Sequence, residues 1–127
     1  KGDYAMTDPR LKKELSPSAL ALFVKGITVE DFGRKVICHM IVETKTEPDE
    51  FQIILSDCTD LTWEVFVDSF EPVGVPLLYG ADVIGIELGE EAYQKRFEVL
   101  TDLFELLAEY RQLEIVHNGR YQEVFAG

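Results

Sequence analysis

The sequence predicts an α+β domain in which an antiparallel β-meander or sheet is packed by one long helix and followed by a C-terminal β-hairpin. Three observations favour this fold class. Apolar residues alternate with polar ones in short stretches between residues 35 and 68, which is the period of a strand. Apolar residues recur with helical spacing between Glu90 and Arg111. An Asn-Gly pair stands between two β-prone runs near the C-terminus.

The length and composition indicate one domain. The chain has 127 residues, of which 46% are hydrophobic, and this is enough for a single core. Residues 1–18 are polar and interrupted by Pro9 and Pro17, so we expect a flexible leader there. The first methionine is Met6, and part of the leader is compatible with a tag. Residues 19–127 are expected to form the domain.

The first half of the chain predicts strands separated by short turns. Lys35–Thr44 is the clearest strand, and its β-branched residues on both faces indicate a central position in the sheet. The alternation continues through two further segments, and breaks rich in Asp, Thr and Pro separate the three. This pattern predicts a three-stranded meander. The other segments are Ala19–Val29 (β-tolerant), Glu30–Gly33 (turn), Lys45–Glu50 (turn), Phe51–Ser56 (strand), Asp57–Asp60 (break) and Thr62–Asp68 (strand).

The middle of the chain is rich in residues that interrupt regular structure. Phe70–Gly80 contains two prolines and two glycines, which forbid a regular helix and discourage a central strand. Val83–Leu88 predicts a further short strand, in which Gly85 marks a bulge or a close backbone approach.

Glu90–Arg111 predicts the one long helix. Its apolar residues cover more than half of the helical circumference, so we expect it to lie across a sheet or between two elements. The polar residues form a narrow stripe that consists of Glu91, Gln94, Glu98, Thr101, Asp102, Glu105 and Glu109. The apolar positions of the pattern are Tyr93, Phe97, Leu100, Phe104 and Leu107.

The C-terminal segment predicts a hairpin around Asn118-Gly119. This dipeptide favours a two-residue turn because both residues tolerate positive φ. Such a turn would pair Val116 with Tyr121 and would set Glu114 against Glu123.

The two cysteines, Cys38 and Cys58, are too few to stabilise a small secreted domain with disulfides. If Lys45–Glu50 is a simple hairpin loop, Cys38 lies opposite Asp57 and Cys58 projects from the other face, which argues against a disulfide.

The chain shows no signal-peptide pattern, and its longest apolar run, Ala19–Val24, is far shorter than the ~20 residues of a membrane helix. We therefore expect an intracellular, cytoplasmic protein that does not bind a membrane.

The net charge of −12 is concentrated in the middle of the chain. Between Thr46 and Gln94 there is no lysine or arginine, and the rest of the chain is balanced. Such a surface repels phosphate backbones, so direct nucleic-acid binding is not expected. Three interpretations remain: a solubilising face, a docking surface for a basic partner, and divalent-cation binding. The acids of this block are Glu47, Asp49, Glu50, Asp57, Asp60, Glu64, Asp68, Glu71, Asp82, Glu87, Glu90 and Glu91.

No catalytic, cofactor-binding or metal-binding motif stands out. The spacings of cysteine and histidine fit no zinc site, and the Asp57–Asp60 segment lacks the pattern of an EF-hand loop. The glycines fit no phosphate-binding motif. We therefore predict no cofactor and no metal, and we favour a protein that is not an enzyme.

The predicted interaction site is an acidic hairpin that carries the single tryptophan. Trp63 has two interpretations: a core residue that anchors the sheet, or part of an aromatic and acidic patch for a basic peptide. The function that follows is a non-enzymatic protein-interaction or oligomerisation module for a basic protein or peptide, with a homodimer left open. The candidate residues are Asp57, Asp60, Glu64, Asp68 and Trp63.

A second hypothesis is a small enzyme or ligand-binding domain. Its site would be a cleft between the helix and the sheet, lined by the glycine-containing segment Val73–Gly85.

The block Leu22–Asp68 resembles the opening strands of the head-domain superfamily of the centriolar cartwheel protein and the DNA-end-joining scaffold proteins. The likeness is carried by the strand Phe51–Asp57, the Asp60-Leu61 turn and the return strand through Trp63, with Leu113–Val116 as a second element. The resemblance implies a dimerising, non-catalytic scaffold head, and it transfers no functional residue.

Overall fold

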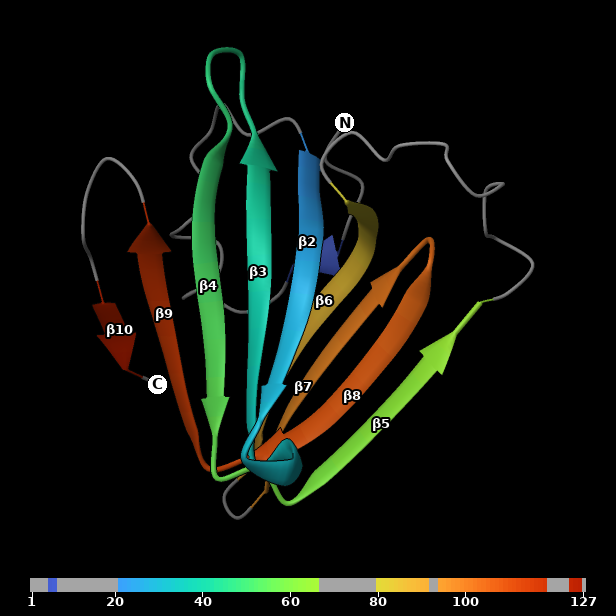
Figure 1. Ribbon diagram of the computed structural model, residues 1–127, viewed down its shortest axis with the longest axis vertical. Coiled ribbons are helices and arrows are strands. Elements are labelled where there is room, and N and C mark those ends of the chain that lie inside the picture. Colours follow the sequence, from blue (N-terminus) through green and yellow to red (C-terminus); the bar gives the residue numbers. More distant parts are fainter. Residues whose placement is uncertain (1–4, 7–20, 67–79, 92–93, 119–123, 127) are drawn as a thin grey trace.

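Strands account for most of the residues that the computed structural model describes (Figure 1), which are 5–6, 21–66, 80–91, 94–118 and 124–126. A 3-10 turn, η1 (Asp31–Gly33), is the one helical element among these residues. The strands are β1 (Ala5–Met6), β2 (Ala21–Glu30), β3 (Lys35–Glu43), β4 (Asp49–Ser56), β5 (Asp60–Val65), β6 (Ala81–Glu91), β7 (Gln94–Thr101), β8 (Phe104–Tyr110), β9 (Gln112–Asn118) and β10 (Val124–Ala126).

The predicted helix over Glu90–Arg111 is wrong, and so is the α+β fold class. These residues form the end of β6, all of β7 and all of β8, and the domain is an antiparallel β structure. Burial along the two later strands has a period of two rather than 3.6 residues. The buried side chains are Phe97, Val99 and Thr101 on β7, and Leu106, Ala108 and Tyr110 on β8.

A hydrogen-bonded turn at Thr101 separates β7 from β8. The Thr101 hydroxyl accepts hydrogen bonds from the backbone N–H groups of Leu103 (3.1 Å) and Phe104 (2.9 Å), and it donates to the Phe104 carbonyl (3.0 Å). The Asp102 carboxylate accepts from the backbone N–H of Asp82 (2.9 Å) and so ties the turn to the start of β6. Threonine and aspartate side chains compete with a helix in this way, which explains why the chain turns here.

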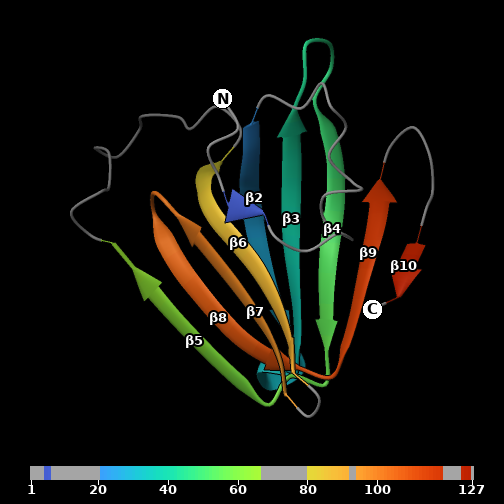
Figure 2. The same cartoon turned by 180° about the vertical axis from the view of Figure 1, so that it is seen from behind.

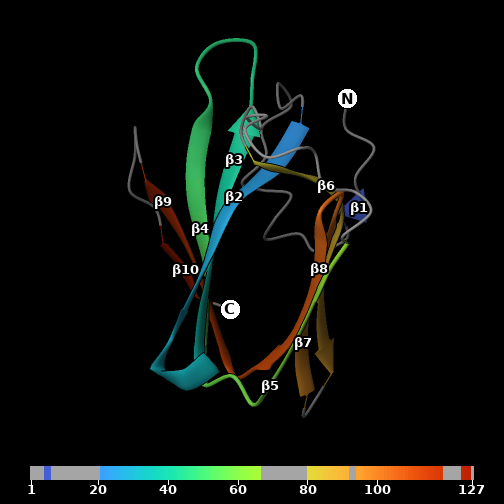
Figure 3. The same ribbon diagram turned by 45° about the vertical axis from the view of Figure 1, so that its right-hand side comes forward.

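The sheet is folded over on itself into two layers (Figure 3). The strand order is β10-β9-β4-β3-β2-β6-β7-β8-β5, and β1 adds to β6 in parallel. We call β2, β3, β4, β9 and β10 the first layer, and β5, β6, β7 and β8 the second layer. The two layers pack against each other and bury the core between them.

Within the described residues, the two layers are joined by one strand pairing and by two short connections of the chain. At one edge β2 pairs with β6 through Phe23 with Asp82 and Val24 with Ala81. At the lower corner, β4 leads into β5 and β8 leads into β9. The Arg111 N–H donates there to the Ser56 carbonyl at 3.1 Å. Strands that switch layers at bends are typical of sheets that pack across one another.

Several strand predictions are confirmed, but the meander is wrong. β3 lies between β2 and β4, as its two apolar faces indicate. The third strand, β5, forms but leaves β4 and pairs with β8 in the other layer. β6 contains the predicted strand Val83–Leu88, and its register shifts between Val83 and Gly85, which confirms the bulge.

The C-terminal hairpin pairs β9 with β10, but its predicted register is wrong. Val116 lies opposite Val124 rather than Tyr121, and Glu114 lies opposite Ala126. The connection is therefore longer than a two-residue turn, and residues 119–123 lie outside the described residues. Most of the predicted leader lies outside them too, as does the Pro- and Gly-rich segment before Gly80.

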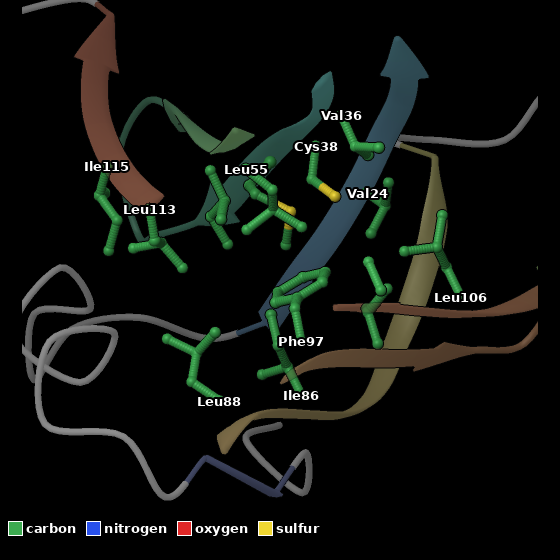
Figure 4. Close-up of a cluster of buried hydrophobic side chains, with 14 of the residues drawn as sticks. Val24, Val36, Cys38, Leu55, Ile86, Leu88, Phe97, Leu106, Leu113 and Ile115 are labelled. Atoms are coloured by element: carbon green, nitrogen blue, oxygen red, sulfur yellow. The ribbon is translucent and has the colours of Figure 1, made fainter. Parts of the chain in front are cut away.

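The core is a continuous apolar cluster between the layers (Figure 4). Phe97 is fully buried, and its ring points from the second layer toward Leu55 and Cys38 of the first. Cys58 belongs to the same cluster, so the prediction that it projects away from Cys38 is wrong. Both thiols are free. Because one face of each central strand is buried, the opposite faces are left for the surface.

Candidate docking surface

The outer face of the second layer gathers carboxylates from four adjacent strands. These strands lie side by side in the view of Figure 2. Their inward residues fill the core, so the alternate residues point away from it. We call this surface the acidic face. Its acids are Asp60 and Glu64 on β5, Glu105 and Glu109 on β8, Glu98 on β7, and Glu87 on β6.

The strand register places several of these acids directly opposite one another. Asp60 lies opposite Glu109, Glu64 opposite Glu105, and Glu87 opposite Glu98. Like charges in directly opposed positions cost roughly 0.2–1 kcal/mol of stability relative to neutral pairs. These cross-strand pairs therefore do not stabilise the fold.

Among the described residues of these four strands, one base shares the acidic face. The Arg96 guanidinium pairs with the Glu98 carboxylate at 3.0 Å. In the sheet, Arg96 lies between Gly89 of β6 and Glu109 of β8. A single exposed ion pair neutralises little of the face. Negative potential thus dominates this surface.

Two shallow hollows mark the acidic face. The larger, of about 150 Å³, includes Gly85, Glu98 and Glu105 in its lining. The smaller, of about 90 Å³, includes Thr62 and Leu107. Sites for small molecules usually enclose roughly 300–1,000 Å³, so neither hollow suits a substrate of ordinary size.

The predicted site residues are distributed between two sides of β5. Asp60 and Glu64 lie on the acidic face, whereas Trp63 stands on the opposite face of the same strand. The Trp63 side chain is 44% exposed, and its ring lies 5.9 Å from that of Phe104. Asp57 is exposed at the corner before β5 and has a positive φ of 55°. Asp68 lies outside the described residues.

The acidic block of the sequence does not form one patch. Glu47 lies in the β3–β4 loop, and Glu50 on β4 pairs with Lys25 at 3.6 Å, so this part of the block belongs to the first layer. Half of the acidic face comes instead from Glu98, Glu105 and Glu109, which sequence analysis assigned to the polar stripe of a helix. The alternation of Glu105 and Glu109 with buried residues on β8 is the sequence signal that could have located them.

The outer face of the first layer carries a polar row around His39. Gln52 Nε2 lies 3.4 Å from His39 Nδ1, and Thr28 Oγ1 lies 2.8 Å from His39 Nε2. Both ring nitrogens of His39 therefore have a hydrogen-bond partner, and which of them donates depends on the tautomer. The row links three strands and gives the histidine a structural role. Within the described ranges, no three His, Cys, Asp or Glu side chains gather as a metal site would require.

The buried cysteines predict a loss of stability at alkaline pH. Burial, followed by the charge of Cys58, raises the pKa of the Cys38 thiol from 9.0 to about 12. Burial, followed by the charge of Asp57, also raises the pKa of Cys58. Above pH 9 the unfolded chain releases thiol protons that the folded chain retains, so the free energy of unfolding should fall as pH rises from 9 toward 12. The slope per thiol is at most about 1.4 kcal/mol per pH unit.

Urea denaturation between pH 8 and pH 10.5 tests this expectation. Cys38→Ala should lower the free energy of unfolding at every pH, but it should flatten the decline above pH 9. An identical slope in the variant and the wild type would contradict it.

In the part of the chain that the structure describes, no helix has the length and apolarity needed to cross a membrane. No protein-family model, curated protein sequence or solved structure matches the chain.

Proposed function

We propose that this domain is a non-enzymatic protein-interaction module that docks a basic protein or peptide on the acidic face. One observation carries the proposal: the register sets Glu64 directly against Glu105 and Glu87 directly against Glu98, on a surface whose Arg96 is already paired. A cationic ligand would relieve this repulsion, and the gain would appear as binding energy.

The dimensions of the face allow its charges to act together. Neighbouring strands are about 4.8 Å apart, so four strands span about 14 Å. The Debye length is about 8 Å at physiological ionic strength, and each carboxylate therefore lies within reach of its neighbours on the next strands. Lysine or arginine side chains placed over the face would interact with several carboxylates at once.

The enzyme alternative has less support. Its cleft was expected beside a helix at Glu90–Arg111, and these residues form strands. The hollows on the acidic face are smaller than ordinary ligand sites, and His39 is engaged in a structural hydrogen-bonded row. The small volume of the hollows gives little support to a small-molecule site, whereas the negative charge of the face favours a basic partner.

The double variant Glu64→Gln/Glu105→Gln tests the proposal. It should weaken binding of a capped poly-arginine peptide by about 3- to 10-fold at 50 mM salt, because each exposed charge contributes up to about 1 kcal/mol. The same variant should be as stable as the wild type, or more stable by a few tenths of a kcal/mol, because it removes a like-charge cross-strand pair. Fluorescence anisotropy and urea denaturation give the two readouts.

A matched control separates the acidic face from net charge. Glu47→Gln/Glu114→Gln removes the same number of charges from exposed positions of the first layer, and it should change peptide affinity by less than 2-fold. Wild-type affinity should fall steeply between 50 and 300 mM salt. Equal losses in both double variants, or affinity that does not depend on salt, would reject the acidic face as the docking surface.

A further inference from the structure

Strand β5 lies at one end of the sheet. In the strand order it follows β8, and β8 is its one partner among the described strands (Figure 1). A strand in this position presents backbone N–H and C=O groups along its outer edge, and such an edge can accept a further strand.

The residues whose backbone faces outward can be identified from the register. The Phe66 N–H donates to the Leu103 carbonyl at 2.9 Å. Antiparallel pairs alternate between hydrogen-bonded and non-bonded positions. The residues two and four places before Phe66, which are Glu64 and Thr62, therefore also bond toward β8. The intervening residues, Leu61, Trp63 and Val65, therefore direct their N–H and C=O groups toward the open edge.

The side chains of β5 divide by the same alternation. Trp63 and Val65 are 44% and 47% exposed, which is unusual for large apolar residues on the inward side of a strand. Asp60 and Glu64 point to the other side, onto the acidic face. β5 contains none of the lysines or prolines that commonly protect an edge strand from pairing.

We infer that β5 binds an extended segment of the partner as an added strand, and that this segment alternates basic and apolar residues. Its apolar side chains would lie beside Trp63 and Val65, and its basic side chains would lie beside Asp60 and Glu64. The inference rests on the proposed function for the sign of the partner's charge. It adds the binding mode, which is pairing of the partner's backbone with a sheet edge.

A second copy of this chain fits the edge less well than a basic segment. Pairing β5 with β5 would place two acidic faces side by side, and the added carboxylates would repel one another. A basic segment instead brings opposite charge to the same positions. Charge complementarity therefore selects the occupant.

A capped seven-residue peptide that alternates arginine and valine, with arginine at both ends, is the probe. The chain has one tryptophan, so a change of Trp63 fluorescence reports binding at this edge. In an antiparallel pair the valines lie opposite Trp63 and Val65, so their N–H groups bond to β5 while those of the arginines face away. N-methylation of the valines should weaken binding at least 10-fold, and N-methylation of the arginines should change it by less than 3-fold.

Two further comparisons complete the test. A peptide of the same composition with its arginines grouped at one end should bind at least 5-fold more weakly than the alternating peptide. Trp63→Thr, measured by the fluorescence anisotropy of labelled peptides because the variant has no tryptophan, should bind the alternating peptide more weakly while poly-arginine still binds in a salt-dependent manner. Equal effects of the two methylation patterns would refute strand addition at β5, but they would not contradict the proposal that the acidic face docks a basic partner. Concentration-dependent dimerisation abolished by Trp63→Thr would overturn it in favour of a second copy.

Discussion

A Gly80→Ala variant is expected to lose at least about 3 kcal/mol of unfolding free energy, or to fail to fold. Gly80 has a φ of +122°, a conformation that alanine rarely adopts. An added Cβ would also collide with the Val24 carbonyl oxygen, and it would lie 2.9 Å from the Val24 carbonyl carbon and 3.0 Å from the Lys25 Cα. All three atoms belong to backbone, so no side-chain rotation can relieve the contact.

The position of this contact makes the effect large. Gly80 directly precedes β6, where Ala81 pairs with Val24 and joins the two layers. Moving either strand would disturb the junction on which the core depends. Urea denaturation measures the loss.

Gly26→Ala is the matched control, because Gly26 lies on β2 near the same junction and its added Cβ would meet nothing within 4 Å. This variant should be unchanged or more stable by up to about 1 kcal/mol. If Gly80→Ala is as stable as Gly26→Ala, then β2 and β6 do not approach each other as closely as described.

The strands that depend on local alternation could be predicted from sequence. In β3 the residues Val36, Cys38 and Met40 are buried, as the period of two indicates, and β4 follows at the expected turn. The bulge at Gly85 was likewise visible, since a glycine inside a β-prone segment has few other uses. These features need no knowledge of distant parts of the chain.

The path of the chain after β4 could not be predicted in the same way. The corner at Asp57 adopts a positive φ without a glycine to mark it, and β5 then pairs with β8, which begins at Phe104, 39 residues after β5 ends at Val65. Alternation within Thr62–Asp68 reveals that a strand exists, but it says nothing about which strand lies beside it. A meander, in which β5 would pair with β4, is the simplest arrangement, but the chain instead bends after β4 and β5 joins the second layer.

The helix was predicted because two periods coincide in one segment. Leu100 and Leu107 complete a helical pattern with Phe97 and Phe104, yet they lie half-buried on the acidic face. Leucine and glutamate also favour helices intrinsically, and pairing with neighbouring strands overrode that preference. Thr101-Asp102 was the contrary signal within the segment.

The error in the helix also limited prediction of the site. Glu64 could be selected from sequence because it belongs to a recognisable strand, and Asp60 because it lies in the acidic break before that strand. Glu98 and Glu105 could be placed beside them only once their segments were known to be strands. The acidic face is therefore a product of register, and net charge along the sequence located only part of it.

Thr101→Ala is expected to destabilise the domain by about 2–4 kcal/mol. The Thr101 side chain is fully buried, and its hydroxyl serves the N–H groups of Leu103 and Phe104 as well as the Phe104 carbonyl. Alanine would leave these part-buried backbone groups without their partner and would also open a small cavity beside the core. If these residues formed a helix, Thr101→Ala would instead raise the unfolding free energy, because Thr101 would lie on the polar stripe and alanine is the stronger helix former.

A series at this position separates the two contributions. Thr101→Ser keeps the hydroxyl and should cost only about 1 kcal/mol, whereas Thr101→Val keeps the shape and should cost nearly as much as alanine. The exposed Thr62 on β5 provides the control, since Thr62→Ala should change stability by less than about 1 kcal/mol. The order serine, valine, alanine from most to least stable is the signature of a hydrogen-bonded turn. If alanine proved the most stable of the three, the β7–β8 turn would be refuted, because only a helix rewards the loss of that hydroxyl.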